Sequence, residues 1–345
     1  MKAYVLDAIN EFNIKEVNKP ACDDGEVIVR VDAAGICGSD IPRIYRTGTY
    51  HYPLIPGHEF SGTVVESTEA SNDWLGKRVG VFPLIPCMKC PQCLKKQYEM
   101  CSDYSYLGSR TDGGFAEYVK VPEWNLIELP DSVSSEAAAM LEPMSVAVHA
   151  ARNAGLFDPD FDRDKSIAVM GLGTIGLSLI MMLLGDGFTN VYGIGNKSLQ
   201  RNTALELGLS KDHIIDSKDY IPGENPVDVF FECVGTKQVL DVALKSTAPR
   251  GTIVCVGNPA SDMDIPQKSY WQILRKQFTL VGTWNSSFTH EDNDDWHYVI
   301  DKLASGKINP EKLISHKFDF DNLINGFKLM RDKSEEYIKV MMTTK

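Results

Sequence analysis

The sequence predicts an α/β protein with a mostly-β first domain and a second domain built on a doubly wound parallel sheet. The first part of the chain alternates apolar and polar residues in short runs, as strands do. The run SIAVMGLGTIGLSLIMMLL from Ser166 is typical of a strand, a glycine loop and a helix. At 345 residues the chain is also too long for one ordinary domain, so two domains are expected.

The elements of the first part follow from this alternation and from the turn residues between the runs. Pro20 and Gly25 separate the first strands, and a glycine turn leads into another strand within residues 108–121. A helix is predicted over residues 141–152, with Pro143 in its first turn. The other strands of this part are expected at residues 3–6, 12–16, 26–33, 62–66 and 78–82.

After the glycine loop, strand-like runs alternate with helical ones, which predicts a parallel sheet covered by helices. These strands are expected at residues 190–194, 213–216, 227–233, 251–257 and 278–282. Beyond Trp284 the pattern becomes mixed, and this tail is expected to pack back on the first domain. Its predicted elements are an acidic loop, a helix at 298–305, a strand at 317–320, a helix through 329 and a strand at 337–342. The predicted domains are residues 1–146 with 286–345, and residues 147–285.

Composition and charge narrow the functional classes. Lysines and arginines number 35 against 47 acidic residues, a net charge of −12 that argues against a nucleic-acid-binding protein. The amino terminus lacks the pattern of a signal peptide, and the longest apolar run is too short to cross a bilayer. Four of the eight cysteines lie between Cys87 and Cys101, and without an export signal a metal site is favoured over disulfides. We expect a cytoplasmic protein with a small-molecule substrate and no membrane partner.

Two groups of residues are candidate metal ligands. Cys37 and the pair His58–Glu59 have the residue types of a catalytic zinc site, which uses three protein ligands and leaves one position open. The alternative is a buried thiol beside a surface His-Glu pair. Glu142, at the mouth of the predicted helix, is either a partner of the helix dipole or a further ligand.

The second group is a C-x2-C-x2-C-x7-C array, whose short gaps let the thiolates converge on one tetrahedral ion. It consists of Cys87, Cys90, Cys93 and Cys101. We predict a structural zinc site, with an iron–sulfur cluster or four unrelated buried thiols as the alternatives. The remaining cysteines lie in apolar or turn contexts and are interpreted as structural thiols.

The glycine loop has the spacing of a dinucleotide-binding turn, with the pyrophosphate resting on the helix N-terminus. Its residues are Gly171, Gly173, Thr174, Ile175 and Gly176. One strand later, where an acidic residue would hold the ribose of NAD, the chain reads Gly195-Asn196-Lys197, with Arg201 one turn on. Two cations without a carboxylate favour NADP(H) over NAD(H), unless Lys197 and Arg201 are merely solvated helix residues.

These motifs, in this order, resemble the zinc-dependent medium-chain dehydrogenase/reductase family, over essentially the whole chain. The matching segments are CGSD at 37–40, GHEFSG at 57–62, the cysteine array, LEP at 141–143 and GLGTIG at 171–176. The resemblance implies a GroES-like catalytic domain, formed by residues 1–146 and 286–345, with an inserted Rossmann domain at 147–285. The Glu-Pro of LEP is similar to the polyol dehydrogenase branch, in contrast to the cysteine of the alcohol dehydrogenase branch.

The resemblance also implies roles for individual residues. Cys37, His58 and either Glu142 or Glu59 would hold a catalytic zinc, and the cysteine array a second, structural zinc. Asp40 would fix the tautomer of His58, and Ser39 would take the proton of the alcohol while its hydride passes to the nicotinamide.

The expected activity is interconversion of a sugar alcohol, or its phosphate, and the corresponding ketose. Arg43, Arg46, His51 and Arg110 are candidate receptors of a substrate phosphate, although some of them are expected to be ordinary surface cations. Trp284 and Asn285 are candidates to line the pocket, and Trp284 is equally suited to a subunit interface. The alternatives are a dehydrogenase of an unphosphorylated polyol or secondary alcohol, such as sorbitol or butanediol, and a non-catalytic zinc protein that senses NADPH. A homodimer or homotetramer is expected, with the strand ending at Gly282 as a candidate for edge pairing.

Overall fold

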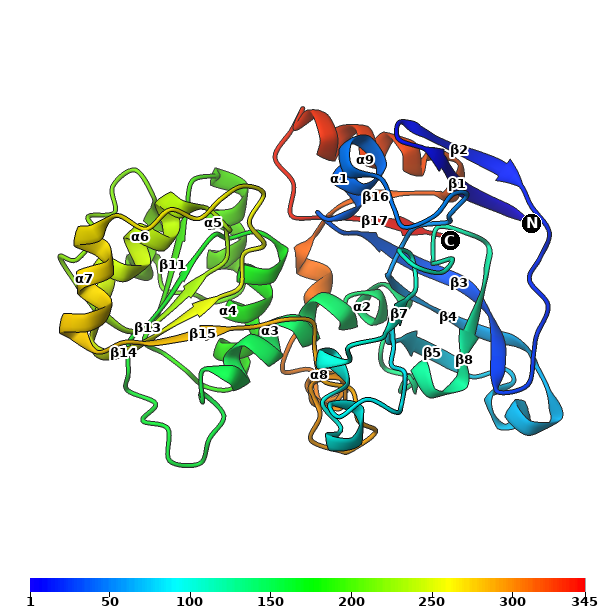
Figure 1. The fold of residues 1–345 in the computed structure, drawn as a ribbon, viewed down its shortest axis with the longest axis horizontal. Coiled ribbons are helices and arrows are strands. Elements are labelled where there is room, and N and C mark those ends of the chain that lie inside the picture. The colour runs from blue at the N-terminus through cyan, green and yellow to red at the C-terminus, as the bar shows by residue number, and fades with distance from the viewer. Residues whose placement is uncertain (345) are drawn as a thin grey trace. The chain divides into compact units, whose positions relative to one another are not determined.

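The computed structural model describes residues 1–344, and the chain divides into two compact units (Figure 1). Unit 1 comprises Met1–Glu142 and Ser287–Lys345, and unit 2 comprises Pro143–Ser286. The chain therefore leaves the first unit, builds the second and returns to the first. None of the described helices has the length and apolar character that a membrane span requires.

Unit 1 is built on a mostly antiparallel sheet in the order β16-β17-β3-β4-β5-β9, with β8 also paired to β3. Its strands are β3 (Glu26–Ile36), β4 (Glu59–Ser67), β5 (Arg78–Val81), β8 (Tyr118–Pro122), β9 (Leu126–Glu128), β16 (Ile314–Phe318) and β17 (Lys339–Thr343). Strands β1 (Lys2–Ala8) and β2 (Glu11–Glu16) form a hairpin, and β6 (Leu84–Ile85) pairs with β7 (Ser105–Tyr106).

The helices of unit 1 are short, and the longer ones come from the returning segment. They are α1 (Asp40–Pro42), α2 (Ser135–Ala139), α8 (Asp295–Ala304) and α9 (Leu323–Asp332). A further helix, α3 (Leu141–Asn153), begins in unit 1 and continues into unit 2. The core of unit 1 joins apolar residues of β3, β4 and β5 to those of α9, so the C-terminal segment is part of the first domain's interior.

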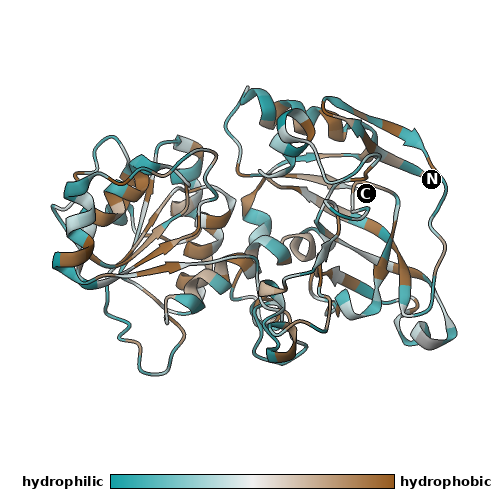
Figure 2. Cartoon of the chain, viewed as in Figure 1, coloured by the Kyte–Doolittle hydropathy of each residue, from teal (hydrophilic) through white to brown (hydrophobic). Residues whose placement is uncertain are grey.

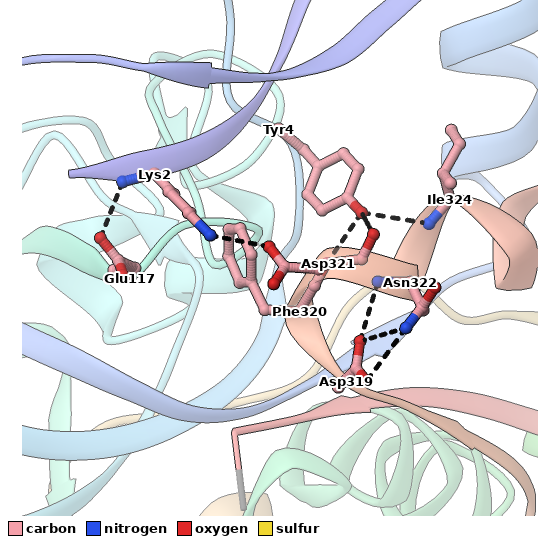
Figure 3. A network of polar contacts seen from close by, with 8 residues as sticks. All are labelled: Lys2, Tyr4, Glu117, Asp319, Phe320, Asp321, Asn322 and Ile324. Carbon is pink, nitrogen blue, oxygen red and sulfur yellow. Dashed lines mark hydrogen bonds and ion pairs between the residues drawn. The ribbon is translucent and has the colours of Figure 1, made fainter.

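Polar contacts also tie the C-terminal segment to the first strand (Figure 3). The Tyr4 hydroxyl donates to the carbonyl of Phe320 at 2.8 Å, and the Lys2 ammonium pairs with Asp321 at 2.9 Å. The Asp319 carboxylate accepts from the Asn322 backbone and caps a short 3-10 turn there. The predicted strand at 317–320 is therefore wrong at both limits, because β16 begins at Ile314 and this capped turn ends it after Phe318.

Unit 2 is a six-stranded parallel sheet in the order β12-β11-β10-β13-β14-β15, which confirms the predicted doubly wound fold. The strands are β10 (Ile167–Met170), β11 (Val191–Gly195), β12 (Ile214–Asp216), β13 (Val227–Glu232), β14 (Thr247–Cys255) and β15 (Thr279–Gly282). The helices are α4 (Thr174–Gly185), α5 (Ser198–Glu206), α6 (Lys237–Ser246) and α7 (Gln267–Lys276), and they lie on both faces of the sheet (Figure 1). Apolar residues run along the strands, while the outer helices carry polar ones (Figure 2).

One buried ion pair crosses the sheet of unit 1. Lys339 on β17 and Glu59 on β4 are each only 2% exposed, and the Lys339 ammonium donates to the Glu59 carboxylate over the intervening strand β3. Gly35 lies opposite Glu59 in the β3–β4 register, and a Cβ atom at Gly35 would overlap the carboxylate. The Lys339 ammonium also donates to the Ile36 carbonyl at 3.3 Å, so its charge has two partners.

We expect Lys339→Met to destabilise the zinc-free protein by about 3–5 kcal/mol, because removing one member of a buried pair leaves an uncompensated charge. Urea unfolding of the zinc-free variant measures this loss. The double variant Glu59→Gln, Lys339→Met should recover most of it, since no buried charge is then left alone. Lys328→Met, an exposed lysine of α9, is the matched control. A loss for Lys339→Met no larger than that of the control would contradict the prediction.

Candidate functional site

Three candidate metal ligands of unit 1 converge on one point. Cys37 follows β3, His58 precedes β4 and Glu59 is its first residue, and the ligand atoms of the three residues lie within 4.8 Å of one another. Gly57, before His58, has a φ of +102° and packs its backbone against Phe115. A side chain at residue 57 would be strained and crowded, so the turn that delivers His58 requires glycine.

Asp40 organises this cluster from a fully buried position in α1. One carboxylate oxygen accepts from the Cys37 backbone at 3.0 Å. The other lies 3.5 Å from Nδ1 of His58 and accepts from the Arg43 guanidinium at 2.6 Å. A carboxylate beside Nδ1 favours the proton on that nitrogen, which leaves Nε2 with a lone pair for a metal. Asp40 therefore links two of the candidate ligands and is itself held by Arg43.

The electrostatics of the cluster favour a cation. Burial lowers the pKa of His58, but the neighbouring Asp40 and Cys37 side chains outweigh it and raise that pKa well above the ordinary value. Burial likewise lowers the pKa of Lys339, and interaction with Glu59 and Cys37 outweighs it and raises the pKa. Both groups hold a proton because anionic groups surround them. A metal ion that replaced the proton of His58 would be stabilised by the same neighbouring groups.

Glu142 lies beside the cluster without joining the group of three converging ligand atoms. Its carboxylate is buried and accepts from the Tyr106 hydroxyl at 3.3 Å. Burial raises the pKa of Glu142 to about 7, with His58 opposing the rise and Glu59 adding to it. The structure thus gathers a sulfur, an imidazole and a carboxylate donor, with a second carboxylate nearby. This donor set fits zinc with one position left open.

Sequence reasoning missed two residues of this site, Lys339 and Tyr106. Lys339 stands in the apolar final strand as a lone charge, and a lysine in such a run is a signal for a buried partner. Tyr106 lies on β7, directly after the cysteine array, and its ring meets that of His58 edge-on at 5.8 Å between centroids. That Lys339 contacts Glu59 and that Tyr106 contacts His58 could not be read from the sequence, because these residues are far apart along the chain.

The four cysteines of the array form a second, closed cluster in unit 1. Their sulfur atoms lie within 4.8 Å of one another, with Cys87 and Cys93 4.0 Å apart and Cys90 and Cys101 3.9 Å apart. Four sulfurs at about 2.3 Å from one tetrahedral ion are separated by about 3.8 Å, so these distances fit a single ion. Backbone N–H groups, led by that of Cys93, lower the pKa of Cys90 to about 5, whereas burial raises the pKa of Cys93 to about 12. All eight cysteines are free of disulfides.

The glycine loop of unit 2 has the geometry that a dinucleotide requires. Gly171, after β10, has a φ of +103°, and Gly173 is the N-cap of α4. A Cβ at Gly173 would meet open space, whereas one at Gly176 would overlap the Gly171 carbonyl. The loop therefore leaves room for a ligand over the helix N-terminus and packs closely below it.

At the end of β11 the structure corrects one expectation, that no carboxylate accompanies the two cations. Asp216, the last residue of β12, is the register partner of Gly195 and pairs with the Arg201 guanidinium at 3.0 Å. Arg201 also donates to the Gly195 carbonyl at 3.0 Å. Asn196 is exposed, and Lys197 is the half-buried N-cap of α5. The sequence did not show Asp216 because the carboxylate comes from the neighbouring strand.

The other predicted residues are distributed between the two units. The Arg43 guanidinium donates to the Asp40 carboxylate. Ser39 and Arg46 are exposed. Trp284 lies in unit 2 and is 53% exposed.

His51 and Arg110 lie together in unit 1, since Nε2 of His51 contacts the Arg110 carbonyl at 3.1 Å. The Arg110 guanidinium stacks 4.6 Å from the ring of Tyr50 and 4.2 Å from that of Tyr104. The pair lines a cavity of about 460 Å³ whose lining does not include Cys37, His58 or Glu59.

Comparison with known families matches both parts of the chain. Residues 23–131 match the alcohol dehydrogenase GroES-like domain, and residues 174–305 match the zinc-binding dehydrogenase domain. The chain is 32% identical over 332 residues to galactitol 1-phosphate 5-dehydrogenase of Escherichia coli K12, with 93% of this chain and 94% of that protein covered.

Solved structures agree with this result. The crystal structure of galactitol-1-phosphate dehydrogenase from E. coli has a TM-score of 0.90 at 29% identity, covering 99% of this chain and 100% of that chain. A zinc-binding dehydrogenase from Sinorhizobium meliloti 1021, bound to NADP, has a TM-score of 0.88 at 26% identity, with 99% and 98% covered. A protein described as a short chain alcohol dehydrogenase from E. coli CFT073, complexed with NADH, has a TM-score of 0.88 at 28% identity, with 99% of each chain covered.

Sequence, fold and comparisons lead to the same conclusion. The chain belongs to the zinc-dependent medium-chain dehydrogenase/reductase family and is an oxidoreductase that acts on CH–OH groups.

Proposed function

We propose that the protein interconverts a polyol phosphate, such as galactitol 1-phosphate, and the corresponding ketose, using a zinc ion and NAD(P). The observation that carries this proposal is the convergence of Cys37, His58 and Glu59 around the buried carboxylate of Asp40. Three donors of different types, with room for a fourth, suit a zinc ion that exchanges substrate. The similarity to galactitol 1-phosphate 5-dehydrogenase suggests the substrate class.

When bound, zinc supplies Lewis-acid polarisation of the substrate oxygen, and the nicotinamide accepts or donates the hydride. Cys37, His58 and Glu59 would hold the ion, and Lys339 orients Glu59 through one carboxylate oxygen. Asp40, beside Nδ1 of His58, favours the proton on that nitrogen, so Nε2 would be the atom that holds the ion. Ser39, exposed beside Cys37, would take the proton of the alcohol and pass it outward.

Within this proposal Glu142 has two candidate roles, as an exchanging ligand of zinc and as a group that accepts and releases a proton. The closer set of donor atoms favours Glu59 as the resting ligand. Glu142, held by the Tyr106 hydroxyl and with a pKa raised to about 7 by burial, is then placed to exchange with water or substrate at the open position. A carboxyl group that titrates near neutrality is suited to accepting and releasing a proton there.

We further propose that the cysteine array holds a second, structural zinc, which gives two zinc ions per chain. Four sulfur donors would fill the tetrahedral shell of one ion, so no position would remain for a substrate. Eight cysteines without a disulfide also support a reducing, cytoplasmic location.

We propose that unit 2 binds the dinucleotide over the loop from Gly171 to Gly176 and that unit 1 carries out catalysis. NADP(H) is favoured over NAD(H), because Lys197 and Arg201 follow β11 where a 2′-phosphate would lie, although Asp216 offsets the charge of Arg201.

We also propose a homodimer or homotetramer in which β15 pairs edge to edge. It is the last strand of its sheet among the described residues, and Leu280 on it is 48% exposed. A native mass equal to one chain would refute this arrangement.

The activity itself is tested by following nicotinamide absorbance with a panel of phosphorylated and free polyols and both cofactors. We expect turnover that is strongest with a polyol phosphate, is lost on removal of zinc and returns on its addition. Asp40→Asn should lower kcat/KM by about 10- to 100-fold, as loss of the partner of a ligating histidine does. A non-catalytic NADPH-sensing protein would instead bind the cofactor and turn over none of the panel, and this result would refute the proposal.

Recognition of the substrate phosphate is tested at Arg110, whose stacked guanidinium retains donors beyond its contacts with Tyr104 and Tyr50. We expect Arg110→Ala to raise the KM for galactitol 1-phosphate about 10- to 100-fold, the cost of losing a hydrogen bond to a charged group. The KM for free galactitol should not change. Arg30→Ala, at an exposed arginine of β3 that is not among the candidate receptors, is the control. Equal effects on both substrates would exclude Arg110 as a phosphate receptor.

A further inference from the structure

Asp216 lies at the edge of the sheet where cofactor choice is expected, yet it belongs neither to the glycine motif nor to the residues that follow β11. It ends β12, the strand parallel to β11, and the register places it beside Gly195. Its side chain is 17% exposed, so its charge is only partly screened by solvent. The carboxyl end of β11 is where the ribose of a dinucleotide is recognised in this type of sheet. A carboxylate from the neighbouring strand therefore stands at the same edge.

The contacts of Asp216 fix both its charge and its position. One carboxylate oxygen pairs with the Arg201 guanidinium at 3.0 Å, and the other accepts from the Lys218 backbone at 3.0 Å. The Lys218 ammonium is 3.8 Å from the first oxygen. The Lys218 backbone N–H and the Arg201 charge lower the pKa of Asp216, so the group is a carboxylate at neutral pH. Arg201 and Asp216 together thus form a neutral pair.

We propose that Asp216 is a specificity-determining residue that opposes binding of a 2′-phosphate and limits the preference for NADP(H). This inference rests on the proposed dinucleotide site of unit 2. Arg201 would attract the 2′-phosphate of NADP, and the adjacent carboxylate neutralises that attraction and repels the phosphate. NAD(H) lacks this phosphate, so neither the attraction by Arg201 nor the repulsion by Asp216 changes its binding much. Cofactor choice then depends on the balance of Arg201 and Asp216.

A purely structural role for Asp216 makes the opposite prediction. If the carboxylate served mainly to hold Arg201 in place for NADP, removing its charge would weaken NADP(H) binding. Arg201 has a second anchor in the Gly195 carbonyl, and asparagine retains an oxygen that accepts from the guanidinium. Asp216→Asn therefore removes the charge while keeping the position of Arg201, and it separates the two roles.

The more obvious substitution, an acid at Gly195, is a poorer test. A Cβ atom there would lie 3.0 Å from side-chain atoms of Leu172, so that side chain would have to move. A change in cofactor preference could then follow from a shifted β11 loop. Asp216 carries its charge at the same edge of the sheet without this crowding.

The test is the dissociation constants of NADPH and NADH, measured by calorimetry on the full-length protein, for the unmodified chain and Asp216→Asn. We expect the ratio of the two constants to shift toward NADPH by roughly tenfold, mainly through tighter NADPH binding, as removal of one nearby charge implies. Asp216→Ser should shift the ratio in the same direction. Asp219→Asn, an exposed acid on the loop after β12, should leave it unchanged.

An unchanged ratio in both Asp216 variants, or a shift toward NADH, would overturn the inference while the unmodified protein still binds its cofactors. Failure of the unmodified protein to bind either nucleotide would instead overturn the proposed function, and this inference with it. Because binding is measured directly, the result does not depend on the zinc ion or on the substrate. The ratio of kcat/KM for the two cofactors should follow the ratio of the dissociation constants.

Discussion

The ion pair between Glu59 and Lys339 is the constraint on which the arrangement of unit 1 depends. Two opposite charges can be buried only with close partners, and here the partners come from strands on either side of β3. The pair passes over Gly35, which therefore has no room for a side chain. Because Lys339 lies near the C-terminus, the chain must return from unit 2 and complete the sheet before the cluster of Cys37, His58 and Glu59 is fully assembled.

The two cysteine-containing clusters differ in how many donors they supply, and this difference separates their chemistry. The array from Cys87 to Cys101 brings four sulfur donors together, whereas Cys37, His58 and Glu59 bring three donor atoms together. The array lies in the chain between the paired strands β6 and β7, and Tyr106 on β7 donates to Glu142 beside the cluster of Cys37, His58 and Glu59. An ion bound by the four cysteines would thus help to fix the segment that carries Tyr106.

Most of the fold could be predicted from periodicity, because alternating strands and the strand–glycine–helix run are local patterns. The candidate ligands Cys37, His58 and Glu59 could be proposed from residue type and spacing, and the structure brings their donor atoms together. Lys339, Tyr106 and Asp216 could not, since each contacts a residue of another helix or strand that only the folded chain brings close. The cofactor prediction shows the consequence: Arg201 is visible in the sequence, but the carboxylate that neutralises it lies 15 residues further along the chain, on β12.

The central claim is that Glu59, held by Lys339 over Gly35, helps to build a zinc site that is separate from the cysteine array. Measuring tightly bound zinc per chain in Gly35→Ala tests it most directly, with Gly38→Ala, where a Cβ meets open space, as the matched control. The account predicts two zinc ions per chain in the unmodified protein and the control, and one in Gly35→Ala, retained by the array. Two equally tightly bound ions in Gly35→Ala would contradict it.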